Sequence, residues 1–496
     1  MISILDAAED PKLFGPWFSS SASWAAWFAL LCGLPMTPDQ FALYQKCTGR
    51  SVAPTAPARE GWLVCGRRAG KSFVLALIAV FLAFVRDYAQ YLAPGARATI
   101  LVLAADRKQA RVIFRYISAL LKQVPMLAQM IENERAESFD LTNGVTLEVG
   151  TNSYRSVRGY SFAAVLCDEL AFWRSEDSAS PDFEVLAAIK PGMATIPTAM
   201  LLCASSPYSR RGALYDAHAR HYGKDGQILV WQAATRIMNP SVPQSFIDEE
   251  MDKDPASARA EYLAEFRTDF ESFIEIEKIR ACITPGVYER PPDRRNRYFA
   301  FVDPSGGSGQ DSFCLAIAHK EAAPLDGKRR TETLVLDLVR ERKPPFSPEA
   351  VCEEFADLLR KYRCTSVRGD RYAGGFPPDC FKKFGINYEA SDKTKSELFV
   401  DLLPHINSQM VDLLDNERMI AQFVALERRT SPNGKDQITH PPAGHDDLAN
   451  AIAGALCRAL EKRSADDRHH WASHTFPKVN LGFERFKTRG AYRRRR

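Results

Sequence analysis

The sequence predicts an α/β chain with two domains, and three observations support this prediction. Short apolar strands alternate with helices over residues 59–245, as in a mostly parallel sheet covered on both faces. A glycine-containing turn joins the first of these strands to a long apolar helix. A second series of strands begins near residue 297, and acidic residues stand at the ends of its elements. The chain of 496 residues is long enough to form two separate cores.

Prolines and changes of pattern divide the chain further. We expect an N-terminal segment with a linker at 1–58, a first domain at 59–245, a connector at 246–296, a second domain at 297–462 and a basic tail at 463–496. The last twelve residues contain seven Lys or Arg and no acidic residue. Such a tail is typical of a flexible arm for an acidic partner, and equally of a solvated terminus.

Composition favours a reducing compartment and does not itself indicate nucleic-acid binding. The formal net charge is only +4, and charged residues make up 25% of the chain. Eleven cysteines lack paired CxxC spacing, so we expect reduced thiols and no disulfide framework. No secretory signal is predicted at the N-terminus. The longest apolar run, residues 73–85, is shorter than the roughly 20 residues that cross a bilayer, so no membrane partner is expected.

The turn Cys65-Gly-Arg-Arg-Ala-Gly-Lys-Ser72 nearly matches the phosphate-binding pattern GxxxxGK[ST], with Cys65 in place of the first glycine. In such a loop, backbone N–H groups surround a phosphate at a helix N-terminus. We expect Lys71 to contact the β- and γ-phosphates and Ser72 to help bind Mg²⁺. The remaining expected nucleotide contacts come from the loop, namely Gly66, Arg67, Arg68, Ala69 and Gly70.

An apolar strand at residues 164–167 ends in Asp168 and Glu169. At the carboxyl edge of a parallel sheet, both acids would lie beside the loop. We expect Asp168 to hold Mg²⁺, directly or through water, and Glu169 to polarise the water that attacks ATP. Arg67 is a candidate for stabilising charge on the transferred phosphoryl group, unless it only binds a neighbouring acid. The pattern predicts an ATPase.

Two further segments are candidates for reading the state of the nucleotide. Arg155 and Arg158 could sense phosphate or contact a DNA backbone, and the sequence does not separate these roles. Ser205 and Ser206 follow another apolar strand and could sense hydrolysis through a hydroxyl group.

Acidic residues at three element ends characterise the second domain. Asp303 ends its first strand, Asp370 ends a later strand, and Asp446 and Asp447 open the last helix. Positions so far apart in the chain meet only through tertiary structure. Two divalent cations at a phosphodiester need clustered carboxylates, so the pattern predicts a ribonuclease-H-like metal site. Asp446 and Asp447 compete for the third ligand position, and either one alone would also suit a helix N-terminus.

The motifs and their order resemble the large terminase subunits of tailed phages and of related gene transfer agents. The resemblance covers about residues 35–460. The stretches that carry it are Cys65–Ser72, Ser156–Ser161, Val165–Glu169, Ala204–Pro207, Val302–Asp311 and Gly444–Ala451.

The resemblance implies a P-loop ATPase domain of the RecA or ASCE type, followed by a ribonuclease-H-like nuclease domain. It implies Walker roles for Lys71, Ser72, Asp168 and Glu169, and a cis arginine finger at Arg67. It implies that Asp303, Asp370 and either Asp446 or Asp447 are the nuclease acids. It also implies an adenine-contacting glutamine near the N-terminus, for which the candidates are Gln40 and Gln45.

The function implied by the resemblance is an ATP-driven motor that moves double-stranded DNA into a procapsid. The same chain would cut concatemeric DNA with Mg²⁺, for which Mn²⁺ could substitute. The implied partners are double-stranded DNA, a portal protein, a small terminase subunit and further copies in a ring, in the cytoplasm of a bacterial host. The alternative is a superfamily-2-like helicase with an accessory nuclease, because Ala104–Ala110 resembles a strand-gripping helicase segment. A helicase would need a second RecA-like domain after Pro240. The sequence instead shows the domain whose elements end in acidic residues, which disfavours the helicase.

Overall fold

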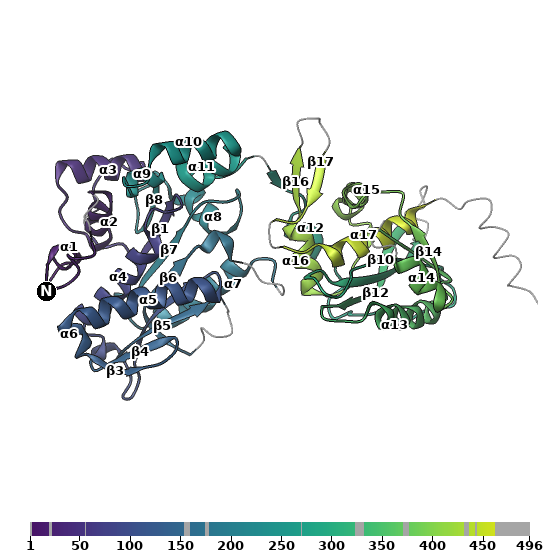
Figure 1. Ribbon diagram of the computed structural model, residues 1–496, viewed down its shortest axis with the longest axis horizontal. Coiled ribbons are helices and arrows are strands. Elements are labelled where there is room, and N and C mark those ends of the chain that lie inside the picture. The colour runs from purple at the N-terminus through teal and green to yellow at the C-terminus, as the bar shows by residue number, and fades with distance from the viewer. Residues whose placement is uncertain are drawn as a thin grey trace, which may run out of the picture.

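The computed structural model describes residues 2–18, 22–54, 56–152, 159–173, 178–268, 270–322, 332–370, 376–430, 436–441 and 444–461. Figure 1 shows two α/β bodies side by side, the first coloured purple to teal and the second green to yellow. Among the described residues, no helix combines the length and apolar character that a membrane span needs.

An eight-stranded sheet forms the first domain, in the order β3-β4-β5-β2-β6-β7-β1-β8. The six strands from β5 to β8 run parallel, and β3 and β4 form an antiparallel edge. The bounds are β1 Glu60–Cys65, β2 Ala98–Ala104, β3 Ile131–Glu134, β4 Ser138–Leu141, β5 Val145–Thr151, β6 Ser161–Asp168, β7 Met200–Ser205 and β8 Ile228–Ala233. The predicted parallel sheet is therefore confirmed, and the carboxyl ends of β1, β6 and β7 meet at one edge.

Each face of this sheet carries its own apolar cluster. Leu63 and Cys65 of β1 pack on one face, whereas Trp62 and Val64 pack on the other, as the alternation of side chains along a strand requires. The first face is covered by α1 Ile4–Glu9, α2 Ala22–Cys32, α4 Lys71–Val85 and α5 Arg107–Gln123, and the second by α7 Pro181–Met193 and α8 Gly212–His221. The remaining elements are α3 Pro38–Thr48, η1 Ala89–Tyr91, α6 Pro125–Ala128, η2 Leu170–Phe172, α9 Thr235–Met238, α10 Gln244–Lys253 and α11 Pro255–Leu263.

Helices of the N-terminal segment expected at 1–58 pack into the core of the first domain. Helix α2 is apolar on all sides, and Ser23 to Leu31 are all buried. A helix of this kind needs cover all round, and α2 finds it in the core of the first domain against α1, α3 and α9. Thr37 caps α3 by accepting the Gln40 N–H.

The connector expected at 246–296 is divided between the two domains. Helices α10 and α11 join the first domain, where Tyr262 packs with Ile247 and Ala258. Strand β9 (Phe270–Ser272) and α12 (Ile276–Arg280) belong to the second domain, because Ile274 and Ile279 lie in its core. The chain therefore passes from the first domain to the second between α11 and β9.

A six-stranded sheet forms the second domain, in the order β14-β13-β10-β11-β12-β15. Strands β10, β11 and β12 are antiparallel neighbours, and β13, β14 and β15 add parallel pairs. The strand bounds are β10 Tyr298–Asp303, β11 Phe313–Ala322, β12 Glu332–Arg342, β13 Ser366–Gly369, β14 Asn387–Ala390 and β15 Val411–Asp412. Strands β16 (Glu427–Thr430) and β17 (Asp436–Thr439) pair beside β9 in a small third sheet.

Helices cover both faces of the second sheet. α13 (Pro348–Lys361) and α14 (Phe376–Lys383) lie on one face, and α12, α15 (Lys395–Asn407), α16 (Glu417–Ala425) and α17 (Asp447–Leu460) lie on the other. Helix α17 approaches β10 so closely that a Cβ added at Gly454 would collide with the Phe301 ring. This close approach fixes the height of α17 above the strand that ends in Asp303.

We expect Gly454→Ala to lower the free energy of unfolding of the second domain by about 1–3 kcal/mol, because α17 or Phe301 must move to admit the methyl group. Urea denaturation followed by far-UV circular dichroism would measure this loss. Tryptophan fluorescence should change little, since six of the seven tryptophans precede residue 240. The matched control is Gly309→Ala, whose added Cβ meets nothing within 4 Å. Equal losses for the two variants would contradict the packing argument.

Candidate functional site

The phosphate loop lies between the last residue of β1 and the first residue of α4. Arg68 and Gly70 have positive φ (66° and 99°), so the loop curls back toward the helix N-terminus. A Cβ at Gly66 would collide with Thr235, so glycine is required there. Cys65, in contrast, is an ordinary strand residue whose buried side chain packs in the core. The conformation therefore explains why cysteine replaces the usual first glycine.

Lys71 holds the loop together from inside. Its side chain is 4% exposed, and its Nζ donates to the carbonyl oxygens of Cys65 (3.1 Å) and Gly66 (3.2 Å). The same ammonium donates to Ser206 Oγ at 3.0 Å and lies 3.3 Å from a carboxylate oxygen of Glu169. One buried cation thus joins the loop to the ends of β6 and β7.

Ser72 and Asp168 form the polar pair beside Lys71. Ser72 Oγ donates to Asp168 Oδ2 at 2.8 Å, and Gln109 Nε2 donates to both atoms, at 3.1 Å and 2.8 Å. Asp168 Oδ1 is buried and has no hydrogen-bond partner among the residues that the structure describes. Burial, reinforced by the neighbouring Glu169 charge, raises the pKa of Asp168 to about 6. A hydroxyl oxygen and an unpartnered carboxylate oxygen are suitable ligands for Mg²⁺.

Glu169 is oriented by the segment that follows β7. Its Oε2 accepts hydrogen bonds from Ser205 Oγ (3.1 Å) and from the Ser206 N–H (3.2 Å). Its backbone adopts φ 50°, a left-handed conformation that is uncommon outside glycine and that turns the chain into η2. The structure therefore brings together Glu169, Lys71 and the Ser205–Ser206 segment, all of which the sequence singled out.

The arginines of the loop point away from this cluster. Arg67 pairs with Glu261 of α11 at 3.0 Å, and its side chain is 61% exposed. Arg68 is exposed, and its carbonyl oxygen accepts a hydrogen bond from Asn239. The pairing of Arg67 with a neighbouring acid is the second of the two roles considered for it. Arg155 and Arg158 lie outside the described residues.

The N-terminal contact to the loop comes from Trp24 rather than from a glutamine. Trp24 Nε1 donates to Ala69 O at 3.2 Å. Gln40 instead uses its side-chain oxygen to accept the Thr37 N–H, which completes the capping box of α3. Gln45 is exposed on the same helix. An adenine contact by Gln40 or Gln45 stays a prediction.

A cluster of carboxylates lies at the end of β10 in the second domain. Asn450 Nδ2 donates to Asp303 Oδ2 (2.9 Å) and to Asp370 Oδ2 (2.7 Å), so one amide bridges the two acids. Burial, together with the charge of Asp370, raises the pKa of Asp303 well above its usual value. Burial likewise raises the pKa of Asp370. The structure thus brings these two acids together, as their positions at strand ends predicted.

Asp446 and Asp447 have different partners. Asp446 binds the Lys395 ammonium through both oxygens, at 3.1 Å and 2.8 Å. Within the described ranges, Asp447 accepts one hydrogen bond, from the Ser312 N–H at 2.9 Å. Burial raises the pKa of Asp447, and its charge contributes to the raised pKa of Asp303. Asp446 is therefore neutralised by a lysine, whereas Asp447 is a carboxylate without a cationic lysine or arginine partner among the described residues.

Two further side chains could help Asp447 to bind a cation. One ligand atom from each of Asp311, His445 and Asp447 lies within 4.8 Å of the others. His445 Nδ1 is 3.7 Å from Asp311 Oδ1 and 3.9 Å from Asp447 Oδ2. Asp311 ends the glycine-rich segment Val302–Asp311 and is not among the ligands predicted from the sequence.

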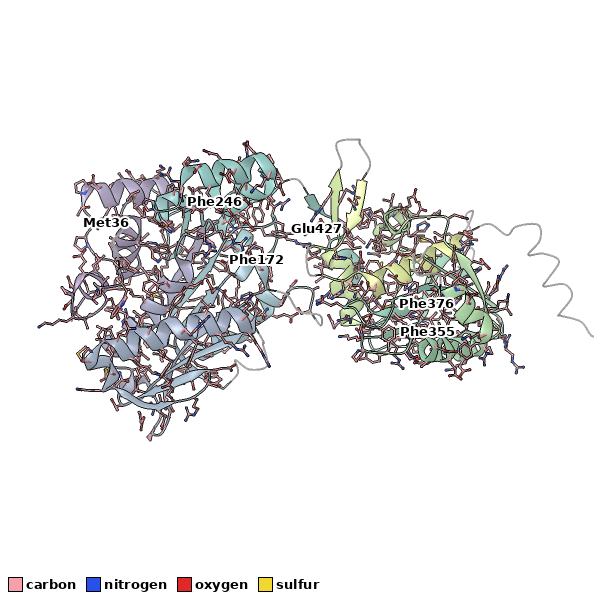
Figure 2. All side chains as sticks on the ribbon, in the orientation of Figure 1. Met36, Phe172, Phe246, Phe355, Phe376 and Glu427 are labelled. Carbon is pink, nitrogen blue, oxygen red and sulfur yellow. The ribbon has the colours of Figure 1, made fainter. Side chains whose placement is uncertain are left out.

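The two domains contact each other through the segment after β7. Arg211 donates to Val424 O (3.1 Å) and to Glu427 Oε1 (3.3 Å), and Tyr208 OH lies 3.4 Å from the same oxygen. Glu427 is fully buried, and Figure 2 labels it where the two domains meet. A cavity of about 430 Å³ adjoins this contact, and its lining includes Ala171, Asp182, Gln422 and His445. The segment that orients Glu169 through Ser206 therefore also carries the domain contact.

Comparison with known proteins places the first domain in a family. The family model described as "Terminase large subunit, T4likevirus-type, N-terminal" matches residues 63–277, which include the phosphate loop, Asp168, Glu169 and Ser206. Residues 63–277 are therefore similar to the N-terminal part of the large terminase subunits. The resemblance stated from the motifs is therefore confirmed. No curated protein sequence matches the chain.

Solved terminase structures resemble the chain loosely. The large terminase of bacteriophage HK97 has 16% identity and a TM-score of 0.37, over 86% of this chain and 97% of that one. The large terminase of the thermophilic bacteriophage D6E in complex with ADP has 12% identity and a TM-score of 0.34, over 86% and 100%. The large terminase nuclease of the thermophilic phage G20c with bound magnesium has 14% identity and a TM-score of 0.31, over 37% and 96%. These likenesses assign no role to any residue of this terminase subunit.

The raised pKa of Asp168 predicts a pH dependence. A protonated carboxyl group does not bind Mg²⁺, so the Mg²⁺-dependent part of the affinity for ADP should be weak at about pH 5 and rise through about pH 6. Titration of a fluorescent ADP analogue, with Mg²⁺ and with a chelator, would measure it.

Asp168→Asn is the control for protonation of the nucleotide itself, since the variant cannot titrate at this position. In this variant, Mg²⁺ should add little to the affinity for ADP at any pH, and the rise of this affinity through about pH 6 should be absent. An equally large contribution at pH 5 and pH 7 in the unmodified protein would contradict the proposed ligand.

Proposed function

We propose that this large terminase subunit hydrolyses ATP in its first domain and uses the energy to move double-stranded DNA into a procapsid. The single observation that carries the proposal is the position of Lys71. Its ammonium contacts the loop carbonyls, Glu169 and Ser206 at once. A change at the phosphates would therefore alter the contact of Lys71 with Ser206 at the end of β7. The same segment also carries the domain contact.

Each side chain of the nucleotide site has a proposed role. Lys71 binds the β- and γ-phosphates, and the N–H groups of the loop surround them. Glu169, oriented by Ser205 and Ser206, accepts a proton from the attacking water. Mg²⁺, held by Ser72 and Asp168, would supply charge neutralisation for the phosphates. Arg67 stays the candidate arginine finger, a role in which it would exchange Glu261 for the transferred phosphoryl group.

We further propose that the second domain cuts concatemeric DNA with divalent metal ions. Asp303, Asp370 and Asp447 are the proposed ligands, because their crowded buried charges need a cation to offset them. Asp446 would hold Lys395 in place instead. Mg²⁺ or Mn²⁺ at this cluster would stabilise the charge on the attacking and leaving oxygens.

Family membership also supports proposals about partners. A portal protein, a small terminase subunit and further copies of this chain in a ring are the proposed partners, in the cytoplasm of a bacterial host. The helicase alternative fits less well. The second sheet is built around the antiparallel strands β10, β11 and β12, whereas a second RecA-like domain would contribute another parallel sheet.

Lys71→Ala should reduce DNA-stimulated ATP turnover by at least about 100-fold, because it removes the cation that binds phosphate. Phosphate release by the full chain, with and without linear duplex DNA, is the measurement. Plasmid cleavage with Mn²⁺ should persist, which shows that the variant is folded. Full turnover in this variant would exclude the proposed ATP site.

Asp303→Asn should abolish Mn²⁺-dependent plasmid cleavage and leave ATP turnover largely intact, because the two sites lie in different domains. Asp447→Asn should have the same effect. Asp446→Asn is the matched comparison, since the variant keeps hydrogen-bonding oxygen for Lys395 and should retain more cleavage than Asp447→Asn. The reverse order would identify Asp446 as the third ligand, and unchanged cleavage by Asp303→Asn would refute the metal site.

A further inference from the structure

Helix α5 carries a row of basic side chains on its solvent side. Arg107, Lys108, Arg111 and Arg115 are all exposed, and none has an ion pair within the part of the chain that the structure describes. At about 100° per residue these positions fall within one face of the helix, over a length of about 12 Å. No acidic residue occurs between Arg107 and Gln123, so nothing on α5 itself offsets the charge.

The unpaired charge is confined to the half of α5 next to the nucleotide site. Lys122 lies on the same face at the far end, but it is neutralised by Glu134 at 2.8 Å. The first residues of α5 follow β2, whose carboxyl end lies at the same sheet edge as the phosphate loop. The basic face therefore starts beside the nucleotide site and runs away from it along α5. Figure 1 shows the course of α5 along the first domain.

The other side of α5 reaches the nucleotide site directly. Gln109 uses one amide nitrogen to donate to Ser72 Oγ and to Asp168 Oδ2. Because Ser72 also donates to Asp168 Oδ2, the three side chains form a closed triangle. The orientation of Asp168, including its unpartnered Oδ1, therefore depends on where α5 places Gln109.

The helix is built to transmit a displacement from one side to the other. Ala110, Ile113 and Ile117 are buried against the first domain, so α5 shifts as a packed unit. Asp106 caps the helix by accepting the Gln109 N–H at 2.8 Å, which ties Gln109 to the helix start. A ligand that displaces α5 by binding to its basic face would therefore also displace Gln109 relative to Ser72 and Asp168.

We propose that α5 senses bound double-stranded DNA. Its basic face binds the phosphate backbone, and Gln109 is the positioning residue that carries the contact to Ser72 and Asp168. Duplex DNA is the fitting partner, because it presents about one negative charge per 1.7 Å and several phosphates therefore face a 12 Å row of cations. This inference rests on the proposed function, and it names the DNA-contacting surface and the reason that DNA would stimulate ATP turnover.

The first arm of the test measures binding of a fluorescently labelled duplex to the full chain without nucleotide. The double variant Arg111→Ser with Arg115→Ser should bind at least about 10-fold more weakly at low salt. For this variant, the slope of log affinity against log salt concentration should be smaller in magnitude by about 2, because two phosphate contacts are lost. Lys122→Ser, a change on the same face at a paired lysine, should bind like the unmodified protein. Unchanged binding and salt dependence in the double variant would overturn the DNA surface.

The second arm uses Gln109→Met, which keeps the volume of the side chain and removes both donated hydrogen bonds. The variant should bind the duplex normally but lose most of the DNA stimulation of ATP turnover. Its affinity for a fluorescent ADP analogue should fall several-fold with Mg²⁺ and stay unchanged with a chelator. A merely structural role would lower both affinities equally, and that result, or full DNA stimulation, would overturn the positioning role.

Different measurements test the proposed motor function and the inference about α5. Absence of ATP turnover in the unmodified protein would overturn the proposed motor function. Duplex binding and ADP binding would still decide the inference about α5, since neither measurement depends on turnover.

Discussion

The first domain depends on a buried ammonium group. Lys71 is almost completely enclosed, and a charge in such a place is costly unless polar atoms surround it. The carbonyl oxygens of Cys65 and Gly66, the Ser206 hydroxyl and the Glu169 carboxylate provide that surrounding. These groups lie at or directly after the carboxyl ends of three parallel strands, so satisfying one cation also fixes the relative positions of β1, β6 and β7 at those ends.

The second domain faces the opposite electrostatic problem. Its buried groups are carboxylates, and burial, reinforced by neighbouring carboxylate charges, raises the pKa values of Asp303, Asp370 and Asp447. The protein relieves part of the repulsion with the Asn450 amide and with Lys395. Helix α17 supplies Asp447 and Asn450 together, and the absence of a side chain at Gly454 lets the helix lie low enough over β10 for both to reach the cluster.

Local signals in the sequence were sufficient to place most site residues, and distant contacts were not. The strand and helix ends carrying Asp168, Asp303 and Asp447 follow from apolar patterns and from helix-start chemistry, and α17 begins where it was predicted. The choice between Asp446 and Asp447 depends on Lys395, which is 51 residues from Asp446. Gln109 was overlooked because its partners are 37 and 59 residues away.

The domain boundaries also depend on tertiary contacts that the composition of a segment does not reveal. The notion of a connector at 246–296 rested on polar and proline-rich composition, which does not reveal which core an amphipathic helix will cover. Tyr262 and Ile279 lie within that range and pack in different domains. Likewise, the apolar character of α2 was visible in the sequence, but its place against α1, α3 and α9 was a matter of tertiary packing.

Cys65 has a consequence for how relatives of this chain are recognised. Cys65 provides a main-chain oxygen to Lys71 and a small side chain to the core, and its backbone is that of an extended strand. Neither contribution needs glycine, so alanine, serine or another compact residue would serve there equally well. A pattern that insists on glycine at the opening of the loop would pass over chains of this kind, whereas one anchored on Gly66, Gly70 and Lys71 would retain them.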